Sequence, residues 1–154
     1  MTLPASFPMS MSQIASELGL ALPLSINHAW VVALAGKSGL PVSFSDLLGQ
    51  SGRIDGSYLA QVGGGGLSVG ITTNAPFFGA TVGGFSFGGH VGSTAYSVSV
   101  SAGCHWNGNL LVKNNTIGQS IVLPWIGSGW GMPSSDGSLL RQGQTDNFTI
   151  TPSN

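Results

Sequence analysis

The first 52 residues repeat one short pattern of apolar and polar positions three times. Each copy is a proline, an apolar residue, a serine, a second apolar residue and then serine or asparagine, and the copies begin at Pro8, Pro23 and Pro41. Proline fixes its own φ, and the apolar–serine–apolar alternation has the period of an extended segment. A short apolar stretch with helical spacing follows each copy. The pattern therefore predicts three units, each an extended piece followed by one or two helical turns.

Polar residues and glycines predict where these helices begin and end. Serine and asparagine side chains can accept a backbone N–H of a first helical turn, so we expect N-caps at Ser12, Asn27 and Ser45. Glycine readily adopts the left-handed conformation that ends a helix. The glycines that follow the three apolar stretches are the expected helix ends: Gly19, Gly36 and Gly49.

A helix of two turns is too short to be stable alone, so the three units must pack on something. We interpret residues 1–52 as a docking segment whose apolar side chains contact the rest of the chain or another protein. The candidate interface residues in it are Met9, Met11, Ile14, Leu24, Ile26, Trp30, Val42, Phe44 and Leu47.

The stretches PMSMSQIASELG and PVSFSDLLGQSG, within residues 3–52, resemble an N-terminal segment of small virion structural proteins of tailed bacteriophages and prophages. In that family a Pro-Ile-Ser-Leu-Ser-aspartate phrase is repeated two or three times, with Ala-Leu-Ala-Gly between copies. Residues 33–36 of this chain are Ala-Leu-Ala-Gly. The chain departs from the family pattern at Gln13 and His28, where an acidic residue is common, and only Asp46 keeps it. The resemblance implies a virion structural component, without implying its position in the particle.

The pattern changes after residue 52. Residues 53–66 contain four consecutive glycines and are interpreted as a hinge, because glycine has little conformational preference. Residues 67–154 contain short runs with the alternation of strands, separated by Gly, Asn, Pro and Ser. The predicted fold is mainly β: a glycine-rich β-sandwich or small barrel, or a more open glycine-rich β structure, preceded by short helices and extended pieces. The expected strands are 67–73, 77–82, 85–87, 96–101, 110–113, 119–123 and 147–151.

Two tryptophans close together, Trp125 and Trp130, are further candidate interface residues. The glycine-rich stretch 124–131 that holds them is typical of a loop that displays two indoles, although tryptophans also fill cores and subunit contacts. A displayed pair would favour an alternative function, in which the β domain binds a glycan or protein on the host surface. The only dense group of amide side chains that could assist is Asn107, Asn109, Asn114 and Asn115.

Charge is scarce: 6% of residues are charged, the formal net charge is −1, and 25 residues are glycine. Nothing therefore favours binding to nucleic acid. No apolar run approaches the length that inserts into a membrane. So few charges make a poorly soluble monomer, so we expect a homo-oligomer or contacts with other virion proteins. The expected location is the virion, assembled in the bacterial cytoplasm.

The motifs that resemble catalytic or metal sites fail on their context. Gly84-Phe85-Ser86-Phe87-Gly88 matches a nucleophile elbow, but no helix is predicted after it. Gly36-Lys37-Ser38 lacks the earlier glycine of a phosphate-binding loop. Cys104 and His105 are adjacent, so in a strand they would point to opposite faces, and a zinc site needs more ligands. We therefore expect no enzyme, cofactor or metal. The predicted function is a non-enzymatic virion component associated with the tail, baseplate or fibre, or else with the capsid surface or collar.

Overall fold

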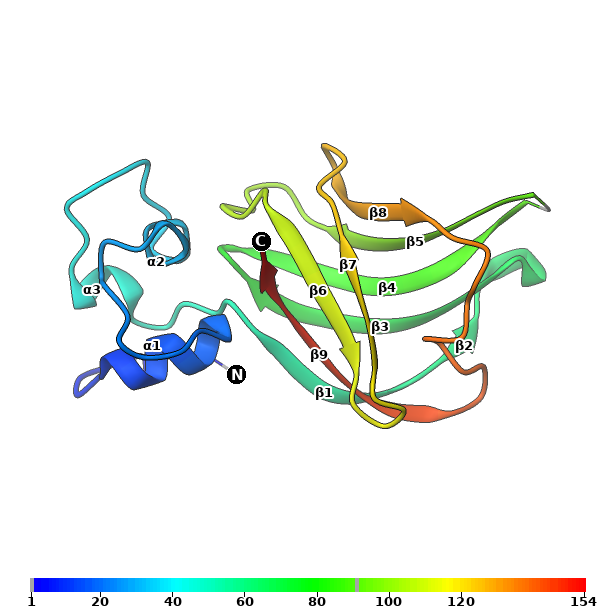
Figure 1. The fold of residues 1–154 in the computed structure, drawn as a ribbon, viewed down its shortest axis with the longest axis horizontal. Helices are drawn as coiled ribbons and strands as arrows, with labels where there is room; N and C mark the ends of the chain where they lie inside the picture. The colour runs from blue at the N-terminus through cyan, green and yellow to red at the C-terminus, as the bar shows by residue number, and fades with distance from the viewer. Residues whose placement is uncertain (1, 91) are drawn as a thin grey trace.

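The computed structural model describes residues 2–90 and 92–154, and its β-sandwich confirms the predicted mainly β fold class. Two antiparallel sheets face each other, with strand orders β1-β9-β6-β7 and β2-β3-β4-β5-β8. Three short helices lie at one end of the long axis (Figure 1). The elements are α1 (Met11–Leu18), α2 (Ala29–Leu34), α3 (Phe44–Leu47), β1 (Ile54–Leu59), β2 (Gln61–Val62), the 3-10 turn η1 (Gly64–Gly66), β3 (Ser68–Phe77), β4 (Ala80–His90), β5 (Ser93–Val100), β6 (Asn109–Asn114), β7 (Gln119–Leu123), β8 (Gly129–Pro133) and β9 (Thr145–Ser153).

The core of the sandwich is built by alternation along the strands. In β5, Tyr96 and Val98 are buried while Ser97 and Ser99 are exposed, as expected for a strand with one face on the core. The ring of Phe85 stacks on that of Tyr96 at a centroid distance of 5.4 Å and meets the edge of Phe148 from the other sheet at 6.4 Å. The two inner faces therefore interlock through aromatic side chains.

The helix ends at glycine are confirmed, but the predicted N-caps are wrong. Gly19, Gly36 and Gly49 all have φ near +70°, the left-handed conformation. The N-caps are Ser10, His28 and Ser43 rather than Ser12, Asn27 and Ser45.

Two of the caps, Ser10 and Ser43, lie two residues earlier than predicted because the side chain three positions after each of them accepts a hydrogen bond from the cap residue's N–H. The Ser10 N–H donates to Gln13 Oε1 at 2.8 Å, and the Gln13 N–H donates back to Ser10 Oγ at 3.3 Å. The Ser43 N–H likewise donates to Asp46 Oδ2 at 2.8 Å. This reciprocal capping box starts the helix directly after the first serine of the copy. The second apolar residue of the phrase is then helical rather than extended.

The middle copy lacks this acceptor, because the residue three positions after its first serine, Ser25, is His28. Its first serine instead makes a turn, in which the Asn27 N–H donates to Ser25 Oγ at 3.1 Å and the His28 N–H donates to the Ser25 carbonyl at 3.0 Å. The helix begins only at Ala29, with His28 Nδ1 accepting from the Trp30 N–H at 3.2 Å. The middle copy thus resembles the other two in sequence, but its helix starts three residues later in the phrase.

The predicted hinge over 53–66 is wrong. Strand β1 occupies residues 54–59 and pairs along its whole length with β9, from Ile54 opposite Ile150 to Leu59 opposite Thr145. Strand β2 pairs with β3, and only the glycines of η1 form an irregular turn. The β structure therefore begins at Ile54 rather than at residue 67.

The predicted strand over 77–82 is also wrong, because the chain reverses direction inside it. Phe77 pairs with Ala80, which leaves Phe78 and Gly79 as a two-residue hairpin loop between β3 and β4. Both have positive φ, 45° and 81°, as a type I′ turn requires. A phenylalanine rarely adopts this conformation, so its surroundings must hold it there.

Those surroundings are the junction between the helices and the sandwich. The Phe78 N–H donates to the Ser51 carbonyl at 2.7 Å, and the His105 N–H donates to the Phe78 carbonyl at 2.9 Å. The Phe78 ring is fully buried against Trp106, at a centroid distance of 5.5 Å. Gly52 lies so close to Leu18, Leu34 and Phe78 that an added Cβ would come within 3.0–3.2 Å of all three side chains.

Other contacts fasten the same junction. Trp30 of α2 meets Trp106 edge to face at 5.3 Å. The His105 ring lies between the helix-ending Gly36 and the hairpin Gly79, with its Cε1 2.7 Å and 2.6 Å from where their Cβ atoms would be. One hydrophobic core runs through helices and sandwich. Residues 2–52 are therefore packed on the sandwich rather than joined to it by a flexible linker.

Candidate functional site

The structure places all eleven predicted interface residues in or against the chain's own core. The five that are buried are Ile14, Trp30, Val42, Leu47 and Trp130. Trp130 is not displayed on a loop: it belongs to β8, and its Nε1 donates to the Gly108 carbonyl at 2.8 Å. These five are unavailable to a partner in this conformation. The other six are half-buried and stay candidates: Met9, Met11, Leu24, Ile26, Phe44 and Trp125.

Residues 2–52, with their three helices, are called the helical segment below. Its large exposed apolar side chains lie at a position that the sequence analysis did not consider. Phe7, Leu22 and Leu40 each directly precede the proline of one copy, and their exposed fractions are 59%, 56% and 58%. The three X-Pro bonds that follow them are all cis. We call these residues the pre-proline triad. The signal that could have found them is an apolar residue before every repeat proline, which is readable once the copies are aligned one residue earlier.

Lys37 and Asp46 hold the helical segment together. Lys37 Nζ lies 3.0 Å from Asp46 Oδ2 and also donates to the Pro41 carbonyl at 3.2 Å. Hydrogen bonding from the Ser43 backbone N–H, helped by Lys37, lowers the pKa of Asp46 to about 2. The Gly36-Lys37-Ser38 motif thus ends one helix and links it to the next, and its lysine is already engaged within the segment.

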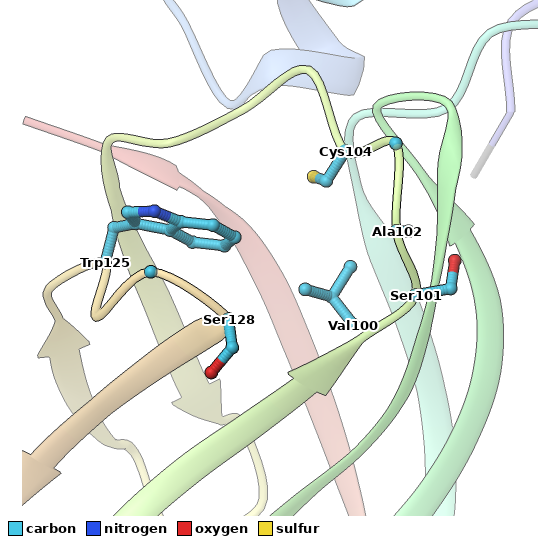
Figure 2. Close-up of a pocket in the computed structure, with 8 residues that line it drawn as sticks. Val100, Ser101, Ala102, Cys104, Trp125 and Ser128 are labelled. Atoms are coloured by element: carbon cyan, nitrogen blue, oxygen red, sulfur yellow. The ribbon is translucent and has the colours of Figure 1, made fainter.

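A cleft of about 340 Å³ lies at the end of the sandwich, between the β5–β6 and β7–β8 loops. Figure 2 shows the Trp125 ring along one side, with Cys104 and Val100 across from it and Ser128 on the same loop as Trp125. The remaining lining residues are Ser101, Ala102, Gly103 and Gly127. None of the lining residues carries a charge.

The Cys104 thiol does not make this cleft reactive. It is half-buried and points to the carbonyl of Trp106 at 3.5 Å and, more weakly, to that of Phe77 at 3.9 Å. Burial raises the pKa of the Cys104 thiol, which favours the protonated, non-nucleophilic form. Within residues 2–90 and 92–154, no three His, Cys, Asp or Glu side chains come together as a metal site would require.

The elbow-like motif lies inside strand β4. Ser86 pairs with Ser97 of β5, and the two hydroxyls are 3.0 Å apart on the outer face of the sheet. This surrounding differs from the strand-to-helix turn that exposes a nucleophilic serine.

Two of the four asparagines considered as ligand partners, Asn114 and Asn115, make hydrogen bonds within the fold away from the cleft. Asn114 is fully buried, and its Nδ2 donates to Asp146 Oδ2 at 2.8 Å and to the Leu139 carbonyl at 3.0 Å. Asn115 Nδ2 donates to Asn147 Oδ1 and to Thr149 Oγ1, both at 2.8 Å. No asparagine lines the Trp125 cleft.

Comparison of the chain with protein-family models, with curated proteins and with solved structures finds no match. Among the described residues, no helix has the length and apolar character needed to cross a membrane. The resemblance of residues 3–52 to phage virion proteins stays a prediction.

Proposed function

We propose that this protein is a non-enzymatic structural component of a tailed-phage virion, which docks through its helical segment and presents the β-sandwich. The observation that carries the proposal is the pre-proline triad. A single exposed apolar residue is ordinary on a protein surface. The same exposed apolar position in each of three sequence copies is a pattern, and it lies in the segment that resembles virion proteins.

Rigidity of the helical segment supports a docking role. The junction through Phe78, Gly52 and the Trp30–Trp106 pair fixes the segment on the sandwich. A preorganised surface loses less conformational entropy when it binds. Phe7, Leu22 and Leu40 are thus held on a rigid support rather than on a flexible tail.

The distribution of charge supports close packing among neighbours. Among the described residues, three ion pairs take up much of the scarce charge: Lys37 with Asp46, Arg53 with Asp55, and Arg141 with Asp146. The surface is therefore nearly neutral, with little charge repulsion to oppose association. We favour a tail, baseplate or fibre-associated position, with homo-oligomer contacts.

The test is incorporation into particles. A phage lacking its own copy of the gene would be complemented with full-length chains carrying Phe7→Ser, Leu22→Ser and Leu40→Ser together. The matched control is Leu59→Ser, Val62→Ser and Leu67→Ser, since these apolar side chains are 46%, 45% and 56% exposed and lie outside the helical segment. Both variants should retain the wild-type circular dichroism spectrum, because the replaced side chains are exposed.

We expect purified particles to lack the triad variant and to contain the control variant at the wild-type level. Normal incorporation of the triad variant would overturn the proposal. Loss of the control variant alone would also overturn it, because the sandwich would then be the docking part.

A further inference from the structure

We propose that the cleft beside Trp125 binds one ring of an uncharged carbohydrate, with the apolar face of the sugar on the indole. The proposal does not depend on the virion role, because it rests on the cleft alone. It assigns a ligand class to the one tryptophan of the described chain that is not buried.

Trp125 is held ready for a ligand. It forms an isolated β-bridge with Trp130, and the two rings meet edge to face at a centroid distance of 4.9 Å. Two backbone hydrogen bonds close this turn, from the Ile126 N–H to the Gly129 carbonyl at 2.9 Å and from the Gly131 N–H to the Pro124 carbonyl at 3.1 Å. Because Trp130 is fully buried, it anchors the neighbouring ring. A fixed aromatic surface binds at a low cost in side-chain entropy.

The rest of the cleft offers an apolar wall and an open, polar rim. Val100 lies across from the indole (Figure 2), and the hydroxyl-bearing lining residues are Ser101 and Ser128. Gly103 and Gly127 both have positive φ, and no atom lies within 4 Å of where their Cβ atoms would be. These glycines leave the mouth of the cleft unobstructed from both loops.

These features select the chemistry of the ligand. No charged side chain lines the cleft, so an anionic or cationic ligand would lose hydration without gaining a partner. The volume of about 340 Å³ lies at the small end of ligand pockets, which suits a single ring. Because the cleft is open on one side, a ligand with one apolar face and hydroxyl groups at its edge is favoured over a wholly apolar one.

A pyranose ring has that character. The C–H groups on one face of the ring carry partial positive charge, and the face of an indole is the negative part of its quadrupole. The hydroxyls at the edge of the ring can remain in water or reach Ser128. The geometry thus pairs each part of the sugar with a matching part of the cleft.

The test uses intrinsic fluorescence of the full-length protein. Trp30, Trp106 and Trp130 are 9%, 8% and 0% exposed, so iodide quenching should report mainly on Trp125. The probes are the methyl pyranosides of glucose, galactose, mannose and N-acetylglucosamine, with methyl glucuronide as the charged comparison and benzyl alcohol as the apolar one. We expect at least one neutral pyranoside to protect Trp125 from iodide in a saturable way, and methyl glucuronide to have no effect.

Three variants measured by calorimetric titration make the result specific. Trp125→Leu should weaken pyranoside binding by about tenfold or more, because it removes the stacking surface. Ala102→Phe keeps Trp125 and fills the cleft from an exposed loop position, so it should weaken binding even if Trp125→Leu fails to fold. Val122→Ala, an exposed apolar position of β7 outside the cleft, should change nothing.

Binding of benzyl alcohol without any pyranoside would overturn the proposal in favour of an apolar ligand. Absence of binding by every probe would overturn it as well. Pyranoside binding that survives both Trp125→Leu and Ala102→Phe would place the sugar elsewhere on the protein.

Discussion

At the scale of single residues, Glu17 is a carboxylate whose buried position opposes its ionisation. It is fully buried in α1, and its Oε1 accepts from the Gly52 N–H at 2.8 Å, the Arg53 N–H at 3.1 Å and the Ser51 hydroxyl at 3.2 Å. No described residue donates a hydrogen bond to its Oε2. The carboxylate links the first helix to the start of the sandwich through one oxygen, and its other oxygen accepts no hydrogen bond from the described residues.

We therefore predict that the ionisation of Glu17 destabilises the fold. Burial raises the pKa of Glu17 above its ordinary value of 4.5, although the hydrogen bonds from Gly52, Ser51 and Arg53 oppose this. The folded state then binds the proton more tightly than the unfolded state. The contribution of Glu17 to stability is fully present below pH 4.5 and is lost as the pH rises through the folded-state pKa, with a slope of at most about 1.4 kcal/mol per pH unit.

Urea unfolding between pH 4 and pH 8 measures this effect. Glu17→Gln keeps an oxygen acceptor and carries no charge, so we expect it to remove the loss of stability above pH 4.5. Asp136→Asn is the control: hydrogen bonding from Ser138 lowers the pKa of this exposed carboxylate, so removing it should leave the loss of stability above pH 4.5 in place. The prediction fails if Glu17→Gln and the wild type show the same dependence on pH.

At the scale of elements, the capping boxes explain why the repeats fold as they do and why their caps were mispredicted. The spacing Ser-x-x-Gln from Ser10, and Ser-x-x-Asp from Ser43, was readable in the sequence. The alternation of the phrase masked it, because the second apolar residue of each copy continues the extended pattern. The helix ends were predictable, since glycine at a left-handed position is a strong local signal.

The reassigned cap predicts a contrast between two neighbouring serines. Ser10→Ala removes the side chain that accepts the Gln13 N–H, so it should lower the free energy of unfolding by about 1 kcal/mol. Ser12→Ala changes an exposed residue inside α1 and should alter it by no more than about 0.5 kcal/mol. Chemical denaturation of both variants measures the difference. A larger loss in the free energy of unfolding for Ser12→Ala than for Ser10→Ala would show that Ser12 is the N-cap.

The strands divide into those that the alternation reveals and those that tertiary packing creates. β5 was readable because every second residue is apolar, and β7 matched its predicted range over Gln119–Leu123. β1 was not, because Asp55, Gly56 and Ser57 interrupt the apolar pattern, and pairing with β9 makes it a strand. β8 has the sequence Gly-Trp-Gly-Met-Pro, which is typical of a loop. It is a strand because its tryptophan is buried in the core.

At the scale of the whole molecule, the candidate site was only partly predictable. Trp125 could be proposed from the sequence, since a tryptophan among glycines is conspicuous. The cleft beside it could not, because its other wall comes from the β5–β6 loop, more than 20 residues away in the chain. The burial of the repeat residues was also hidden, since their partner surface includes the hairpin turn at Phe78.

That turn gives the last prediction, which concerns how far the helices and the sandwich fold as one unit. Removing residues 1–52 takes away the Ser51 carbonyl that binds the Phe78 N–H, and it uncovers the Phe78 ring and the Trp30-covered side of Trp106. Burial of one such side chain contributes about 1.5–3 kcal/mol. We expect the fragment 53–154 to melt at a lower temperature than the full chain and to bind the apolar dye ANS.

Phe78→Asn should have opposite effects in the two proteins. In the full chain it replaces a fully buried aromatic ring with a polar side chain, which should cost about 3–5 kcal/mol. In the fragment that burial is already lost, and asparagine followed by glycine is the preferred pair for a type I′ turn. The substitution should therefore raise the melting temperature of the fragment and reduce its ANS binding. If it lowers the melting temperature of both proteins equally, the ring is stabilised by the sandwich alone. The helices would then rest on a fold that does not need them.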